Sequence, residues 1–127
     1  MDEDFPNAAG RHWRDGETLM EQERLENADQ LYGFAAECAL KSALVSLGSF
    51  QEEVHRRHIN ELWNKMQITS FHRRYPGLAR LLTGSNPFAD WEVRQRYFAD
   101  GYVSYETLQR HKDRARRLLI ATSLYRG

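Results

Sequence analysis

The histidines are the side chains of this sequence best suited to proton transfer or metal binding near neutral pH. His55 and His58 are three residues apart within an expected helix, a spacing at which two imidazoles can share one metal ion. The residues around them do not complete a closed ligand set, and Arg56 and Arg57 make the segment cationic. We therefore expect no metal site and no cofactor, and His58 stays a candidate for proton transfer.

Arginines and tyrosines gather between Trp91 and Tyr105, around an expected interruption of a helix. Arg94 and Arg96 offer planar guanidinium groups, which bind carboxylate or phosphate through paired hydrogen bonds. Tyr102 and Tyr105 follow closely, so a polar site could be assembled where the helix breaks. Packing of the aromatic rings in the core is the alternative interpretation of this segment.

Basic residues form two further groups that could bind phosphate: Arg56 and Arg57 with Arg73 and Arg74, and Arg110, Lys112, Arg114, Arg116 and Arg117. In the second group, residues 110, 114 and 117 share one helical face and could form a directed stripe. The other explanation is complementarity within the chain, because residues 1–40 carry an excess of acids and residues 41–127 an equal excess of bases. A net charge of zero argues against strong nonspecific binding to nucleic acid.

Several functional classes lack their sequence signatures here. The chain has no Gly-rich phosphate loop, no His-Glu-x-x-His motif and no Gly-x-Ser-x-Gly motif. Cys38 is the single cysteine, so no internal disulfide can form, and we expect a small buried thiol in a cytoplasmic protein. No apolar run reaches the roughly 18 residues of a membrane span, and acidic residues 1–4 do not resemble a signal peptide. We expect no membrane partner.

These side chains must be positioned by helices, because apolar residues recur at helical spacing and no alternating β pattern of useful length is present. The pattern predicts one long helix over Thr18–Leu47, opened by a Thr18-x-x-Glu21 capping box and ended by Gly48 in the left-handed conformation. Glu37 and Lys41 are spaced for an i,i+4 ion pair on its surface. We expect residues 1–16 to form a flexible N-terminal arm and residues 17–127 to form a single helical domain.

The rest of the chain reads as shorter helical segments. We expect helices over Val54–Gln67, from Pro76 through Leu82, from Asn86-Pro87 to Ala99, and over Tyr105–Tyr125 with Ser104 as the N-cap. The sequence therefore predicts the all-α class, as an antiparallel four- to five-helix up-and-down bundle with one long N-terminal helix.

Residues 28–44 combine aromatic and small side chains and contain Glu37 and Lys41 at Glu-x-x-x-Lys spacing. This segment resembles the first core helix of HEPN domains, the prokaryotic and eukaryotic nucleotide-binding helical bundles. His58 followed by Leu62-Trp63, and Arg96-Tyr97 ahead of the final helix, are similar to the family layout. The resemblance covers about residues 17–125.

The resemblance implies an antiparallel helical bundle that commonly forms a homodimer. Family members include ribonucleases of toxin–antitoxin and defence systems and non-catalytic partners of small nucleotidyltransferases. The ribonucleases carry an arginine followed after four to six residues by a histidine near the start of the last helix. In this chain the aligned arginine, Arg96, is followed after five residues by Tyr102 instead. A tyrosine with a pKa of about 10 is a poor base at neutral pH.

We therefore expect a HEPN-like homodimeric domain that binds a nucleotide, RNA or a protein such as an antitoxin or a nucleotidyltransferase, and that lacks the nuclease motif. The binding candidates are Glu37, Lys41, Arg94, Arg96, Tyr102 and Tyr105. The first alternative is a metal-independent ribonuclease with a variant site, which would use Arg94 or Arg96 with Tyr102 or His58. The second is a structural adaptor with no ligand. A binding role is favoured over an enzymatic one.

Overall fold

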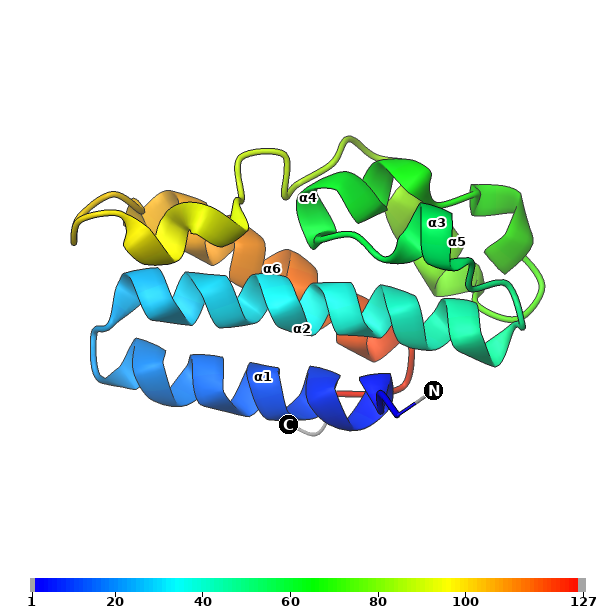
Figure 1. Ribbon diagram of the computed structural model, residues 1–127, viewed down its shortest axis with the longest axis horizontal. Helices are drawn as coiled ribbons and strands as arrows, with labels where there is room; N and C mark the ends of the chain where they lie inside the picture. Colours follow the sequence, from blue (N-terminus) through cyan, green and yellow to red (C-terminus); the bar gives the residue numbers. More distant parts are fainter. Residues whose placement is uncertain (1, 126–127) are drawn as a thin grey trace.

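Long helices form the frame of the protein, and the computed structural model describes residues 2–125. Helices α1 (Phe5–Glu21) and α2 (Leu25–Ser46) run antiparallel, and α6 (Tyr105–Ala121) packs behind α2 (Figure 1). Shorter elements connect α2 to α6: α3 (Glu52–His55), α4 (Ile59–Leu62), η1 (Trp63–Lys65), η2 (Ile68–Phe71), α5 (Pro76–Leu82) and η3 (Val93–Tyr97). They return the chain to the start of α2, so α6 runs in the same direction as α2 (Figure 1). The predicted all-α bundle is confirmed.

The N-terminal boundaries differ from the prediction. The expected continuous helix over Thr18–Leu47 is wrong, because the chain reverses between α1 and α2 at Glu23, whose φ is +60°. The expected capping box is also wrong: Thr18 lies inside α1, and its hydroxyl donates to the backbone oxygen of Arg14 at 3.1 Å.

The segment expected as an N-terminal arm forms most of α1 instead. Asp4 caps this helix by accepting a hydrogen bond from the backbone N–H of Asn7 at 3.1 Å. Along one face, Trp13 packs against Tyr32 of α2, with ring centroids 5.1 Å apart. Gly16 lets the same tyrosine approach so closely that a Cβ there would lie 3.0 Å from its ring. The small contact residue lets α1 lie close against α2.

The predicted helix over Val54–Gln67 is broken into α3, α4 and η1. Within the predicted helix from Asn86 to Ala99, only residues 93–97 are helical, as the 3₁₀ helix η3, and the rest is turn and irregular backbone. The residues at three helix boundaries were predicted correctly: α5 starts at Pro76, Gly48 has a φ of +69°, and Ser104 caps α6.

Helix α2 is the centre of the core. Its alanines are fully buried against α1 and α6, at Ala28, Ala35, Ala36, Ala39 and Ala43. These small side chains let the neighbouring helices pack closely. In the described part of the chain, no helix is both long and apolar enough to cross a membrane.

Candidate functional site

A buried carboxylate of α2 joins one buried and one half-exposed basic side chain. Glu37 accepts a hydrogen bond from Lys41 Nζ through Oε2 at 3.0 Å, and its Oε1 lies 3.0 Å from His58 Nδ1. The side chains of Glu37 and Lys41 are only 10% and 7% exposed, so the expected surface pair is buried. The His58 side chain is 48% exposed and comes from the turn that precedes α4. Together with Phe34, which packs beside them, these residues form what we call the His58 cluster.

The electrostatics of the cluster favour a charged imidazole. The hydrogen bond with Glu37 raises the pKa of His58 above its usual value of 6.5, against the opposing effects of burial and of the positive charges of Lys41 and Arg96. In its protonated form the imidazole donates to Glu37 through Nδ1, while no other group in residues 2–125 is bonded to Nε2. The cluster then joins two basic side chains to a single carboxylate. The half-exposed imidazole of His58 can therefore donate a hydrogen bond from Nε2 to an anion.

Phe34 brings a second histidine to the cluster. Its ring centroid lies 6.0 Å from that of His58 and 5.7 Å from that of His12 on α1. Burial and the charge of Arg11 lower the pKa of His12 below 6.5, whereas Glu37 acts in the opposite direction. Two histidines with opposite pKa shifts therefore border one aromatic ring. Sequence reasoning missed His12 because it lies in the segment expected as an arm; the helical spacing of Phe5, Ala9 and Trp13 was the available signal.

The other member of the predicted histidine pair has a separate role. His55 is buried, and its Nδ1 accepts a hydrogen bond from the backbone N–H of Gln51 at 2.9 Å. Burial lowers the pKa of His55, which agrees with a neutral ring whose Nδ1 accepts the hydrogen bond from Gln51. Across the described ranges, no group of three or more histidine, cysteine or acidic side chains is placed to hold a metal ion.

The predicted arginines lie along η3 at the edge of the cluster. Arg96 is exposed, donates to the backbone oxygen of Val93 at 3.2 Å and lies 4.7 Å over the ring of Tyr97. Its positive charge lowers the pKa of His58, so the two side chains lie within electrostatic range of each other. Arg94 instead pairs with Glu92 at 3.3 Å. Of these two arginines, Arg96 is the one that can share an anionic ligand with His58.

The predicted tyrosines lie elsewhere. Tyr102 packs against Phe98, with ring centroids 4.5 Å apart, and Tyr105 is exposed in the first turn of α6. The turn that carries Tyr102 is tied to the start of α2, because Glu26 accepts from the backbone N–H of Gly101 at 3.0 Å. Residues 26 and 37 are separated by about 16 Å along the helix. The tyrosines therefore do not join the His58 cluster.

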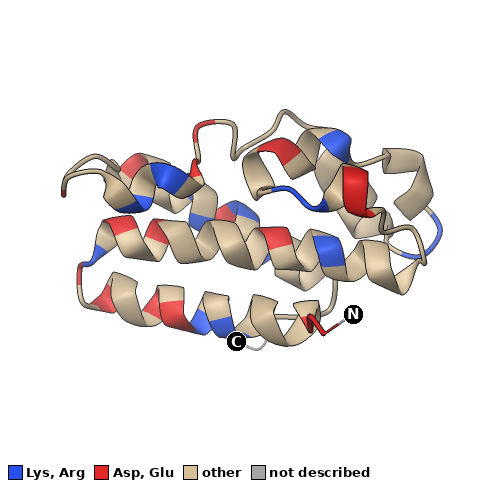
Figure 2. Ribbon diagram, viewed as in Figure 1, with Lys and Arg blue, Asp and Glu red and all other residues tan. Residues whose placement is uncertain are grey.

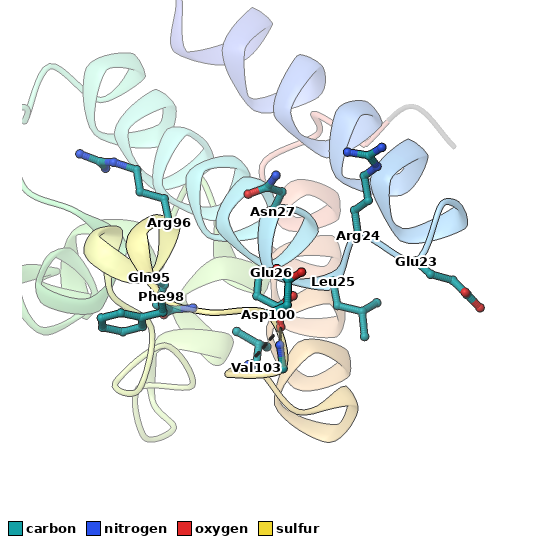
Figure 3. A pocket seen from close by; sticks show the side chains of 11 residues that line it. Glu23, Arg24, Leu25, Glu26, Asn27, Gln95, Arg96, Phe98, Asp100 and Val103 are labelled. Atoms are coloured by element: carbon teal, nitrogen blue, oxygen red, sulfur yellow. Dashed lines mark hydrogen bonds between the residues drawn. The ribbon is translucent and has the colours of Figure 1, made fainter.

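An open pocket adjoins both η3 and the turn that carries Tyr102. It lies beside the first turn of α2 and is lined mainly by residues 23–27 and by residues 95, 96, 98, 100, 101 and 103. Figure 3 shows Arg96 pointing away from Glu26 and Asp100. The predicted pairing of Arg96 with Tyr102 in one site stays a prediction.

A buried histidine missed by the sequence analysis holds η3 in place. His111 is fully buried in α6; its Nδ1 lies 2.7 Å from Asp29 of α2, and its Nε2 lies 2.8 Å from Asp90. Gln95 of η3 donates to the second oxygen of Asp29 at 3.1 Å. Burial alone would lower the pKa of His111, but the hydrogen bonds and charges of the two aspartates outweigh it and raise the pKa. This network fixes the backbone that presents Arg96.

The basic stripe of α6 is largely paired within the chain. Lys112 binds Glu17 of α1 at 3.2 Å, Arg117 binds Asp113 at 2.9 Å, and Arg110 binds Asp90. Figure 2 shows charged residues of both signs along the long helices. Charge complementarity within the chain thus accounts for much of the pattern.

Comparisons with protein-family models, curated proteins and solved structures each gave no match to this chain. The resemblance to HEPN domains therefore stays a prediction. The homodimer, the antitoxin or nucleotidyltransferase partner and the RNA or nucleotide ligand stay predictions with it.

Proposed function

We propose that this domain binds the phosphate groups of RNA or of a nucleotide at the His58 cluster and Arg96. The observation that carries the proposal is the bond between the buried Glu37 carboxylate and the half-exposed His58 imidazole. A carboxylate in this position keeps the imidazole charged and fixes its orientation. Its remaining N–H can then donate to a phosphate oxygen.

The surroundings of His58 suit a nucleotide better than a simple anion. Phe34 is partly exposed beside the imidazole, and Tyr97, next to Arg96, is 75% exposed. Aromatic faces beside positive charge are the combination that single-stranded nucleic acids use, since bases stack on the rings and phosphates contact the cations. Such a stack contributes about 1–3 kcal/mol per base.

The direct test measures the affinity of purified protein for a fluorescent single-stranded RNA by anisotropy, at fixed low salt. We expect His58→Ala and Arg96→Ala each to weaken binding about tenfold, which corresponds to roughly 1.4 kcal/mol. His72→Ala is the matched control, because His72 is exposed and outside the cluster. Equal affinities of wild type and His58→Ala would reject the proposal.

The pH dependence of binding supplies a second test. Because the pKa of His58 is raised, its charge persists to a higher pH than that of an ordinary histidine. We expect the affinity for RNA to fall as the pH rises through that pKa, and this dependence to disappear in His58→Ala. An unchanged pH profile in the variant would assign the dependence to another group.

A second candidate function is metal-independent RNA cleavage, favoured by the opposite pKa shifts of His12 and His58. Near neutral pH, a neutral His12 could remove the proton of a ribose 2′-hydroxyl, and a charged His58 could protonate the leaving 5′-oxygen. The 2′-oxygen would bond to phosphorus while the bond to the 5′-oxygen breaks, which leaves a 2′,3′-cyclic phosphate.

Cleavage is tested with end-labelled RNA in the presence of EDTA. Loss of activity in His12→Ala, His58→Ala and Arg96→Ala, with activity retained in His72→Ala, would support this candidate. If the protein binds the RNA but leaves it intact even at high protein concentration, cleavage is rejected and only the binding role remains.

A further inference from the structure

A second surface hollow is lined by arginines and by no acidic residue. It lies between the C-terminal end of α5, the following loop and α6, and ten residues line it: Trp63, Arg80, Leu81, Thr83, Gly84, Ser85, Asn86, Pro87, Arg110 and Arg114. No carboxylate is among these residues, although the chain as a whole has equal numbers of acids and bases. We call it the arginine pocket.

The arginines of this pocket differ in their pairing. Arg110 is neutralised by Asp90, which lies outside the lining. Arg80 and Arg114 form no ion pair within residues 2–125, whereas Lys112 and Arg117 on α6 each have an acidic partner. Two arginines without an acidic partner in residues 2–125 therefore line one hollow, where an anion would reduce the repulsion between their like charges.

We propose that the arginine pocket binds a terminal phosphate group, of the kind carried by a nucleotide or by the 5′ end of an RNA strand. A phosphate monoester carries about −1.5 to −2 charges at pH 7, which matches the two unpaired guanidinium groups of Arg80 and Arg114. An internal phosphodiester carries a single charge and would leave one of them unbalanced. Guanidinium groups also match phosphate oxygens in geometry, through paired N–H donors.

The local structure offers the phosphate one further partner. Ser85 is an exposed hydroxyl residue of the lining, whereas Thr83 donates its hydroxyl proton to the backbone oxygen of Arg80 at 2.6 Å. Trp63 is buried against Phe88, with ring centroids 6.4 Å apart, and forms an apolar wall. The pocket therefore combines two charges, a hydroxyl residue and a rigid wall.

This pocket is separate from the His58 cluster. It is built on α5 and α6, whereas the cluster is built on α2, the turn before α4 and a ring from α1. The two sites share no side chain. The proposal therefore does not depend on the function proposed for His58.

The test is calorimetric titration of the full chain with inorganic phosphate, pyrophosphate, and a short RNA with either a 5′-phosphate or a 5′-hydroxyl, at constant ionic strength. We expect pyrophosphate and the 5′-phosphorylated RNA to bind at least tenfold more tightly than the 5′-hydroxyl RNA. In Arg80→Gln/Arg114→Gln this preference should disappear. The control Lys65→Gln/Arg14→Gln removes the same charge from exposed residues outside the pocket and should keep this preference.

Three outcomes would overturn the proposal. The first is no measurable binding of phosphate or pyrophosphate to the wild type. The second is equal affinity for the two RNAs, which would indicate backbone binding. The third is an equal loss in the control, which would indicate nonspecific attraction. His58→Ala should retain the 5′-phosphate preference, so failure of either proposal is recognised separately, and circular dichroism checks that each variant folds.

Discussion

The indole of Trp91 lies directly against Gly33 of α2, where no side chain would fit. A Cβ on Gly33 would lie 2.1 Å from Trp91 Cε2 and 2.2 Å from its Nε1. The indole N–H also donates to the backbone oxygen of Asp29 at 3.1 Å. Trp91 is fully buried and stands just before η3, so this contact anchors the segment that presents Arg96.

Gly33→Ala should therefore destabilise the fold, although alanine favours a helix by about 1 kcal/mol. The new methyl group would overlap the indole, and such overpacking costs about 1–3 kcal/mol or more. We expect a net loss of about 2 kcal/mol in the free energy of unfolding, measured by urea denaturation.

The control for this variant is Gly77→Ala in α5. A Cβ there would meet Ala121 Cβ at 3.8 Å, an ordinary contact distance. We expect stability to be unchanged or slightly raised. Equal stability of Gly33→Ala and Gly77→Ala would show that Trp91 does not pack closely against Gly33.

His111 should make stability depend on pH. Its pKa is raised in the folded state, so its contribution is complete below the unfolded pKa of about 6.5 and is lost as the pH rises through the folded value. His111→Ala leaves the buried Asp29 without its charged partner, which costs about 3–5 kcal/mol. The difference in unfolding free energy between wild type and His111→Ala should be largest near pH 6 and smaller at pH 9. A difference that does not change with pH would mean that His111 is neutral in the fold.

Local signals could be predicted from the sequence. Gly48, Pro76 and Ser104 act through their own backbone and nearest neighbours, and the structure places each as expected. The turn between α1 and α2 could not be predicted this way. Its left-handed residue is Glu23, a type that rarely adopts that conformation, and only the packing of α1 on α2 favours it there.

The candidate site could likewise be predicted only in part. Glu37, Lys41 and His58 were singled out by type and spacing, and the structure joins them. His111 and Asp29 are 82 positions apart, and no local pattern indicates that α6 will bring them together. Their burial and pairing depend on tertiary contacts, which one sequence does not show.

Cys38 should be inert towards thiol reagents in the folded protein. Burial, together with the charge of Glu37, raises its pKa to about 12, so the thiolate is scarce at pH 8. We expect little alkylation by iodoacetamide at pH 8 under native conditions and rapid alkylation in urea, followed by mass spectrometry. Fast native labelling would mean that α1 opens readily over this part of α2.

Glu37→Gln tests the bond on which the proposed site depends. The amide keeps the size of the carboxylate but removes its charge, and with it the main cause of the raised pKa of His58. The opposing causes, burial and the positive charges of Lys41 and Arg96, would then remain. NMR titration of the imidazole should therefore place the His58 pKa above 6.5 in the wild type and at or below 6.5 in the variant. His55, whose pKa is lowered by burial and not by Glu37, serves as the internal reference and should titrate alike in both proteins. A His58 pKa unmoved by the substitution would show that Glu37 does not hold the imidazole, and the charge proposed for phosphate binding would lose its cause.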